Sequence, residues 1–342
     1  MTPVGRRLIS GAGVAVLLIG ACGAGRPSSP AAGSAATASE APLQSTIPSA
    51  PFVASATTLR TIGSQLGAEP ILIVGKPLPA HAGYASHAAS YTSAGLTISA
   101  VLHEPTTGGA HPGVVVVHGL VDPATYVTMG ELRREQDALA SAGYVVLDTD
   151  LRGLAGSDPS PPGPPDLDIG STIDVINAVR ALASSGLKSV DGSRIGLLGH
   201  SLGGLLVLRL LVATPGLSKA AVAFAPSNPD TFVNVQQYLT PGEPGYGAVS
   251  AAYGSPRSNP AFWADMSVLT FLDRVTEPLL IVHGDHDRDS PYPWSVATEA
   301  AWRAAGKDVR LVTLPGEDHV FDAAWPTAMA AVLAFFEARL AR

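Results

Sequence analysis

The stretch RIGLLGHSLGGLLVLRLLVA, residues 194–213, decides the fold of this chain. It begins with a short apolar run typical of a buried strand, and it ends with the nearly all-apolar segment 202–213, which is typical of a central helix. Between them, Gly199 and Gly203 flank Ser201 in a turn so tight that a side chain at either glycine would collide with the backbone. This turn lifts the serine hydroxyl above the sheet, and the following helix points its positive N-terminal end at any group that reacts there.

Strand-like and helix-like segments alternate on both sides of this turn. Such alternation predicts an α/β fold with a mainly parallel central sheet and helices on both faces. The segment 226–273 breaks the alternation and is too long for a simple connection, so we predict that it is a small lid or cap insertion. Strands are expected at residues 90–93, 96–103, 113–118, 144–148, 194–198, 220–224, 278–283 and 309–314, and helices at 131–142, 169–182, 202–213, 294–305 and from 326 onward.

A serine hydroxyl is a weak nucleophile unless a base removes its proton. His319 lies in LPGEDHVF, residues 314–321, a loop that directly follows the last predicted strand. Loops that leave the carboxyl ends of parallel strands meet at one edge of the sheet, so this loop can reach Ser201. We therefore predict that His319 is the general base for Ser201.

The base needs a carboxylate that holds its tautomer. The loop HGDHDRDSP, residues 283–291, follows the preceding predicted strand and offers Asp285, Asp287 and Asp289. The same carboxylates, together with the two histidines of this loop, could also suggest a metal site. Alternating acids in a turn more often form local hydrogen bonds with the backbone, so no metal is expected here.

Acyl transfer also needs two fixed backbone N–H groups for the developing oxyanion. Leu202, the residue after the nucleophile, is expected to supply one, and Leu120, in the loop after GVVVVHG (113–119), is expected to supply the other. His118 is expected to brace this loop rather than act as a base. The Asp–Arg pair in the segment 150–153 is expected to be structural.

Six short motifs occur together in this chain: HG (118–119), DLRG (150–153), GHSLGG (199–204), NPAFWAD (259–265), PLLIVHGDHD (278–287) and LPGEDHVF (314–321). Together they resemble the α/β-hydrolase superfamily, and within it the branch of prolyl oligopeptidases and dienelactone-hydrolase-like enzymes, over roughly residues 84–342. The resemblance implies an α/β-hydrolase fold and a serine hydrolase without a cofactor. Its spacing puts the catalytic acid three residues after His-Gly, which implies Ser201, Asp287 and His319 as the catalytic residues.

Two departures from these relatives bear on the expected activity. Dienelactone hydrolases use a cysteine nucleophile, whereas position 201 is serine here. Prolyl oligopeptidases carry a β-propeller before the catalytic domain, and too few residues lie between Cys22 and the first predicted strand for its four-stranded blades. We therefore expect a carboxylesterase that forms an acyl-enzyme on Ser201. One alternative is a prolyl-oligopeptidase-like peptidase, in which Asp230, Glu243 or Asp265 fixes the amino group of a short peptide; the other is a catalytically idle binding lipoprotein.

The N-terminus carries signs of export. The apolar run 8–21 follows Arg6 and Arg7, is too short to span a bilayer, and is typical of a signal peptide. It leads into IGAC, which resembles the lipobox of bacterial lipoproteins and implies a lipid on Cys22. The predicted organisation is a signal peptide over 1–21, a lipidated cysteine with a disordered Ala/Ser/Pro tether over 22–70, and the hydrolase domain over 71–342.

Composition limits the partners and the location. The net charge is −7 and no basic residues cluster, so nucleic acid is not an expected partner. The single cysteine excludes a disulfide within the chain and a cysteine metal site. The expected partners are a small-molecule ester or short peptide and, through the lipid, a membrane. The expected location is the outer side of the cell membrane, with secretion as the second choice.

Overall fold

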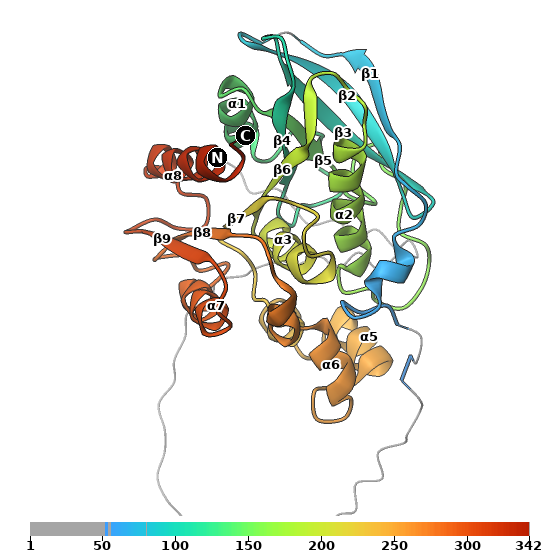
Figure 1. Ribbon diagram of the computed structural model, residues 1–342. Helices are drawn as coiled ribbons and strands as arrows, with labels where there is room; N and C mark the ends of the chain where they lie inside the picture. Colours follow the sequence, from blue (N-terminus) through green and yellow to red (C-terminus); the bar gives the residue numbers. More distant parts are fainter. Residues whose placement is uncertain (1–51, 54–55, 80, 342) are drawn as a thin grey trace, which may run out of the picture.

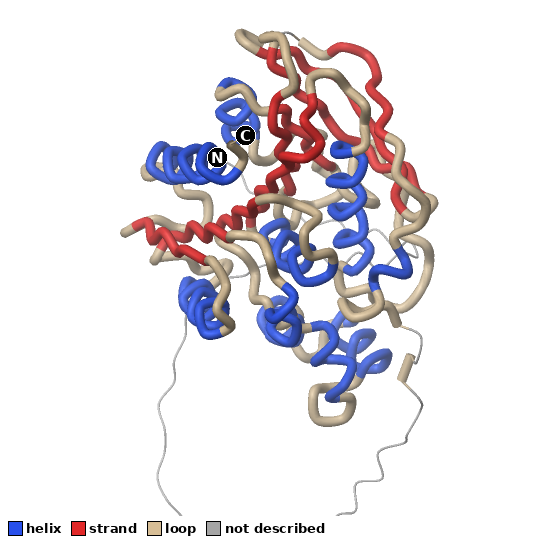
Figure 2. Tube along the Cα trace, viewed as in Figure 1, coloured by secondary structure: helices blue, strands red, loops and turns tan. Residues whose placement is uncertain are grey.

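A nine-stranded sheet forms the centre of the structure (Figures 1 and 2). The computed structural model describes residues 52–53, 56–79 and 81–341. The strands are β1 (Leu72–Pro77), β2 (Tyr84–Ser93), β3 (Leu96–Pro105), β4 (His111–Val117), β5 (Val145–Thr149), β6 (Val190–His200), β7 (Ala220–Phe224), β8 (Leu279–Gly284) and β9 (Val309–Leu314). Their order in the sheet is β1-β2-β3-β5-β4-β6-β7-β8-β9.

The sheet is antiparallel at one end and parallel over the rest. β1, β2, β3 and β5 pair in antiparallel fashion, whereas β5-β4-β6-β7-β8-β9 all run parallel. The hairpin between β2 and β3 turns at Ala94 and Gly95, which both have positive φ (48° and 87°). In the parallel part, each connection must cross from one end of the sheet to the other, which places helices on its faces.

Helices cover both faces of the sheet (Figure 1). They are η1 (Ile62–Gln65), α1 (Arg133–Ser141), α2 (Ile169–Ala183), α3 (Leu202–Ala213), α4 (Thr231–Tyr238), α5 (Pro244–Tyr253), α6 (Pro260–Met266), η2 (Val268–Arg274), α7 (Tyr292–Ala304) and α8 (Trp325–Arg339). The fully buried valines of β4 show the division of the core. Val114 and Val116 pack in the cluster that contains side chains of α1 and α8, and Val115 and Val117 pack in the cluster that contains α2 and α3. A strand that is buried on both faces explains its unbroken valine run.

The predicted α/β-hydrolase fold, with a mainly parallel sheet and helices on both faces, is confirmed. The segments 202–213, 220–224 and 309–314 coincide with α3, β7 and β9. β1 is not among the predicted strands: it is an edge strand with mostly exposed side chains and a central Gly75, so it lacks a clear apolar alternation.

The folded part begins earlier than the sequence indicates. A disordered tether is predicted through residue 70, but Leu59 and Ile62 are each only 1% exposed and belong to the main core. The carbonyl oxygen of Leu66 accepts a hydrogen bond from the Asn177 amide of α2 (2.9 Å). Leu59, Ile62 and Leu66 stand at helical spacing, but the stretch that holds them is short and otherwise polar, so this pattern alone does not mark it as folded.

The segment 226–273, which we call the lid segment, follows β7 and forms α4, α5, α6 and most of η2 (Figure 1). Its helices have their own small apolar cluster, in which Val235, Tyr253 and Trp263 are buried. Arg60, upstream of the sheet, holds the lid segment through an ion pair with Asp265 (2.7 Å). None of the helices in the described residues combines the length and apolarity needed to cross a membrane.

Candidate active site

Ser201 lies in the sharp turn between β6 and α3. Its backbone has φ 57° and ψ −117°, a strained conformation that few residues other than glycine adopt. A Cβ atom on Gly199 would overlap the carbonyl oxygen of Gly203, and one on Gly203 would overlap that of Val117. The backbone N–H of Ser201 donates to the Phe224 carbonyl of β7 (2.9 Å). The predicted steric requirement for glycine at both positions is confirmed.

Asp287 and His319 come together from the loops that follow β8 and β9. These strands are parallel neighbours, so their carboxyl ends lie at one edge of the sheet. Nδ1 of His319 lies 2.7 Å from Oδ2 of Asp287, whose side chain is completely buried. The other carboxylate oxygen, Oδ1, accepts the backbone N–H groups of Asp289 (2.8 Å) and Ser290 (3.0 Å).

These contacts keep the Asp287 carboxyl group ionised. Burial alone would raise its pKa, but hydrogen bonds from His283, His319 and Ser290 and the charge interaction with His319 outweigh burial, and the pKa lies well below its usual range. An ionised carboxylate can only accept hydrogen bonds, so Nδ1 of His319 carries the proton. A neutral imidazole in this tautomer has an unprotonated Nε2, which is the atom that a general base uses.

His200 joins the turn of Ser201 to the loop of His319. Its Nε2 lies 2.9 Å from the His319 carbonyl oxygen and donates to it, and the two ring centroids are 4.6 Å apart. Burial, followed by the influence of His319, lowers the pKa of His200 to about 4. His200 is therefore neutral near neutral pH and adds no positive charge that would oppose protonation of His319.

Ser201 and His319 thus lie at the same edge of the sheet and are joined through His200. Within the residues that the structure describes, no hydrogen bond links the Ser201 hydroxyl to His319. In ligand-free enzymes this bond is often long and shortens only when the substrate is bound.

The loop after β4 passes directly beside the nucleophile. A Cβ atom on Gly119 would lie 3.1 Å from the Cβ of Ser201. Leu120 follows at once, and Leu202 is the first residue of α3, where a backbone N–H has no partner within the helix. Both predicted oxyanion donors therefore belong to backbone that borders Ser201.

Asp150 and His118 brace this loop. The Asp150 carboxylate accepts hydrogen bonds from the hydroxyls of Tyr126 (2.8 Å) and Thr128 (2.7 Å), which both belong to the loop. The ring nitrogens of the buried His118 lie 2.7 Å from the Gly119 carbonyl oxygen and 3.1 Å from that of Asp150. As predicted, His118 supports the loop.

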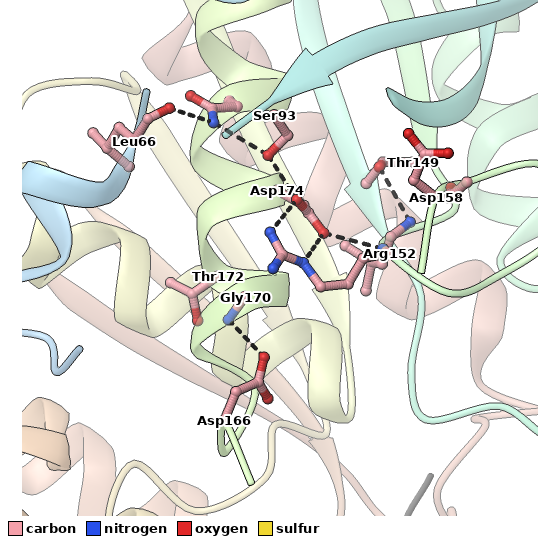
Figure 3. A network of polar contacts seen from close by, with 12 residues as sticks. Leu66, Ser93, Thr149, Arg152, Asp158, Asp166, Gly170, Thr172 and Asp174 are labelled. Carbon is pink, nitrogen blue, oxygen red and sulfur yellow. Dashed lines mark hydrogen bonds and ion pairs between the residues drawn. The ribbon is translucent and has the colours of Figure 1, made fainter. Parts of the chain in front are cut away.

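The Asp–Arg segment 150–153 is structural, as the sequence indicates. Arg152 donates through Nε and Nη2 to the Asp174 carboxylate of α2, at 2.8 Å each. Asp174 also accepts the Ser93 hydroxyl (2.6 Å). Figure 3 shows Arg152 and Asp174 at the centre of a network that joins β2, α2 and the end of β5. The Arg152 guanidinium forms its hydrogen bonds within this network, so it is not placed to bind a ligand.

The two other acids of the loop 283–291 have different contacts. Oδ1 of Asp285 accepts the backbone N–H of Gly316 (2.7 Å) and so joins this loop to that of His319. Asp289 is exposed and contributes its carbonyl oxygen to the hydroxyl of Tyr238 from the lid segment (3.0 Å). Across the described ranges, no group of three His, Cys, Asp or Glu side chains is arranged to hold a metal ion.

Sequence reasoning missed two residues of this region. His283 is completely buried, and its Nε2 lies 2.9 Å from Oδ2 of Asp287. A histidine at the end of the apolar strand PLLIVHG was the available signal, because a buried polar group needs partners. Tyr238 connects the lid segment to the loop 283–291, which carries Asp287. No local sequence pattern predicts this contact.

A mainly parallel sheet whose central strand ends in a strained serine turn is the framework of the α/β-hydrolases, and the fold defines this class. Comparison with family models identifies the family within this class: the model of the prolyl oligopeptidase family matches residues 131–342. The chain belongs to this family of serine hydrolases.

Solved structures with the same fold include both esterases and peptidases. Acetyl xylan esterase 1 from Thermoanaerobacterium sp. JW/SL YS485 has a TM-score of 0.61 and 19% identity, covering 81% of this chain and 92% of its own. Est1E from Butyrivibrio proteoclasticus, solved with ferulic acid, has a TM-score of 0.57 and 23% identity, covering 72% and 97%. An acylaminoacyl peptidase from Pyrococcus horikoshii has a TM-score of 0.56 and 18% identity, covering 80% of this chain but 42% of its own.

Proposed function

We propose that the protein is a carboxylic-ester hydrolase that works through an acyl-enzyme on Ser201. The pairing of Asp287 with His319 at 2.7 Å, at the sheet edge where Ser201 is presented, carries this proposal. His319 takes the proton of the Ser201 hydroxyl as its oxygen attacks the ester carbonyl carbon, and then gives that proton to the departing alcohol. The backbone N–H groups of Leu120 and Leu202 stabilise the oxyanion. Water, activated by His319, then attacks the acyl-enzyme and releases the acid.

The contacts of three carboxylates in the lid segment favour esters over peptides with a free amino terminus. Such peptides would need an uncommitted acid near the site. Asp230 caps α4 by accepting the Phe232 N–H (2.9 Å), and Asp265 is paired with Arg60. Glu243 is exposed and accepts the Thr240 N–H (3.3 Å). Each of these candidates therefore has a local structural role.

Exposed apolar side chains lie on the loops that border the proposed site. Leu120 and Val127 follow β4, and Val320 follows His319; they are 55%, 64% and 45% exposed. Exposed large apolar side chains beside a reactive group give an apolar ligand surface to pack against. They support a substrate whose acyl or alcohol part is apolar.

We expect the full chain to cleave small esters faster than amides that carry the same acyl group. An alkoxide or phenolate leaves more easily than an amine and needs less proton transfer from His319. The measurement compares kcat/KM for nitrophenyl acetate or butyrate with the matched anilides, alongside a panel of aminoacyl and prolyl amides. The full chain should be used, because Leu59 and Ile62 belong to the core and a version cut at residue 70 would lose them.

The peptidase alternative makes the opposite prediction. If an aminoacyl amide matched or exceeded the best ester, and required a free amino terminus, a peptidase acting on short peptides would replace the ester hydrolase. Absence of turnover on every ester and amide of the panel would instead support the idle binding protein.

We also propose that the protein is exported and held at the outer side of the cell membrane by a lipid on Cys22, which lies outside the described residues. In a bacterial host fed with a labelled fatty acid, the native chain and a Ser28→Ala control should incorporate label. Cys22→Ser should not, because the thiol that carries the lipid is missing. An unlabelled native chain in the medium, with an N-terminus beyond Cys22, would indicate plain secretion.

A further inference from the structure

We propose that His283 is a positioning residue of the catalytic site, which holds Asp287 in the orientation that His319 requires. The proposal rests on the proposed function, since it assigns a second support to the same acid. Two histidines share one carboxylate oxygen: Oδ2 of Asp287 lies 2.7 Å from Nδ1 of His319 and 2.9 Å from Nε2 of His283.

Strand β8 places His283 directly beneath the loop that carries Asp287. It occupies the second-to-last position of β8, and side chains alternate along a strand. Its side chain therefore lies on the same face as Leu279 and Ile281, in the layer that α7 covers. The imidazole is completely buried, so each polar atom must find a protein partner.

The partners of His283 determine its tautomer. Nε2 lies 2.9 Å from Oδ2 of Asp287 and 2.9 Å from the carbonyl oxygen of Ser290, which both can only accept hydrogen bonds. Nε2 must therefore carry a proton and donate it. In the neutral ring Nδ1 then accepts, and its partner is the buried hydroxyl of Ser295 on α7, at 2.6 Å. The Ser295 hydroxyl thus satisfies the remaining ring nitrogen and holds the ring plane of His283.

The carboxylate of Asp287 is held by four donors on its two oxygens. The backbone N–H groups of Asp289 and Ser290 bind Oδ1, whereas His283 and His319 bind Oδ2. Of these donors, only His319 takes part in the proposed proton transfer. Without His283, His319 would be the sole donor to Oδ2, and only the two backbone N–H groups on Oδ1 would oppose rotation of the carboxylate away from it.

His283 has no role in binding substrate in this arrangement, because its side chain is completely buried between β8, to which it belongs, and α7. Its loss should therefore lower kcat and leave KM unchanged. We expect His283→Leu to reduce kcat on nitrophenyl acetate by about 10- to 100-fold, the effect of removing a charge-assisted hydrogen bond or a supporting partner of a functional group. His283→Gln should recover most of the activity, because its amide can donate from nearly the position of Nε2.

The same loop supplies a matched control. His286 is three residues away, its side chain is 72% exposed, and its ring makes one long contact with Asp285 (3.9 Å). His286→Leu should keep the kcat and KM of the native chain. All rates should be expressed per folded molecule, measured by circular dichroism and thermal melting of each variant.

A second variant covers the case in which His283→Leu does not fold. Ser295→Ala removes only the hydroxyl that bonds Nδ1 of His283 and holds its ring plane, and we expect kcat to fall several-fold with KM unchanged. Should a folded His283→Leu match His286→Leu in kcat, or should Ser295→Ala retain full kcat where His283→Leu does not fold, the inference is wrong. A native chain without any esterase activity would instead count against the proposed function and not against this positioning role.

Discussion

Replacing Ser201 by alanine is expected to reduce ester turnover by about 10⁶-fold, the effect of removing a serine nucleophile from a serine protease. The hydroxyl oxygen is the atom that attacks the carbonyl, and alanine offers no substitute. The loss should appear in kcat for nitrophenyl acetate, with the melting temperature nearly unchanged, since a single oxygen is removed from a turn whose shape depends on its glycines.

A buried serine elsewhere supplies the control. Ser218 is 2% exposed and precedes β7, at the opposite end of this strand from the Ser201 turn. Ser218→Ala should retain native activity. If Ser201→Ala kept a tenth of the native rate, the nucleophile would have to be sought elsewhere in the chain.

Asp287→Asn is expected to lower kcat by about 10⁴-fold, the loss seen when the aspartate of a serine-protease triad is amidated. All four groups around the Asp287 carboxylate are N–H donors. An asparagine amide nitrogen would face donors at either oxygen position, so one pair of contacts must break whichever way the amide turns. The wrong tautomer of His319 would then be favoured.

Neighbouring acids provide the comparison for this variant. Asp285→Asn keeps an oxygen that can accept the Gly316 N–H, and the Asp289 side chain is exposed. Both amidated variants should therefore lose much less activity. A larger loss for Asp285→Asn than for Asp287→Asn would move the catalytic acid to Asp285.

The sequence predicts the centre of this fold better than its edges. The apolar helix 202–213 and the valine run of β4 are buried on all sides, so their composition alone marks them. β1 is a short apolar run interrupted by Gly75 and is mostly exposed, whereas the segment around Leu59 is largely polar. Both fold because long-range contacts with β2, α2 and the lid segment support them. Such contacts leave no local period in the sequence.

The candidate site divides in the same way. Ser201, Asp287 and His319 stand in short motifs next to strand ends, where spacing and resemblance suffice to predict them. The supporting role of His283 depends on which face of β8 carries its side chain, and on Ser295, which lies twelve residues later in α7. Only the packing of α7 against β8 in the folded protein brings Ser295 to His283, and His283 to Asp287.

The most direct test of the central claim is to locate the covalent adduct that a fluorophosphonate probe leaves on the native protein. An activated serine reacts with this probe much faster than an ordinary hydroxyl, because a base removes its proton. Peptide mass spectrometry after brief labelling should find one adduct, on Ser201, and none in Ser201→Ala. An adduct on another residue, or equal labelling of Ser201→Ala, would contradict the account.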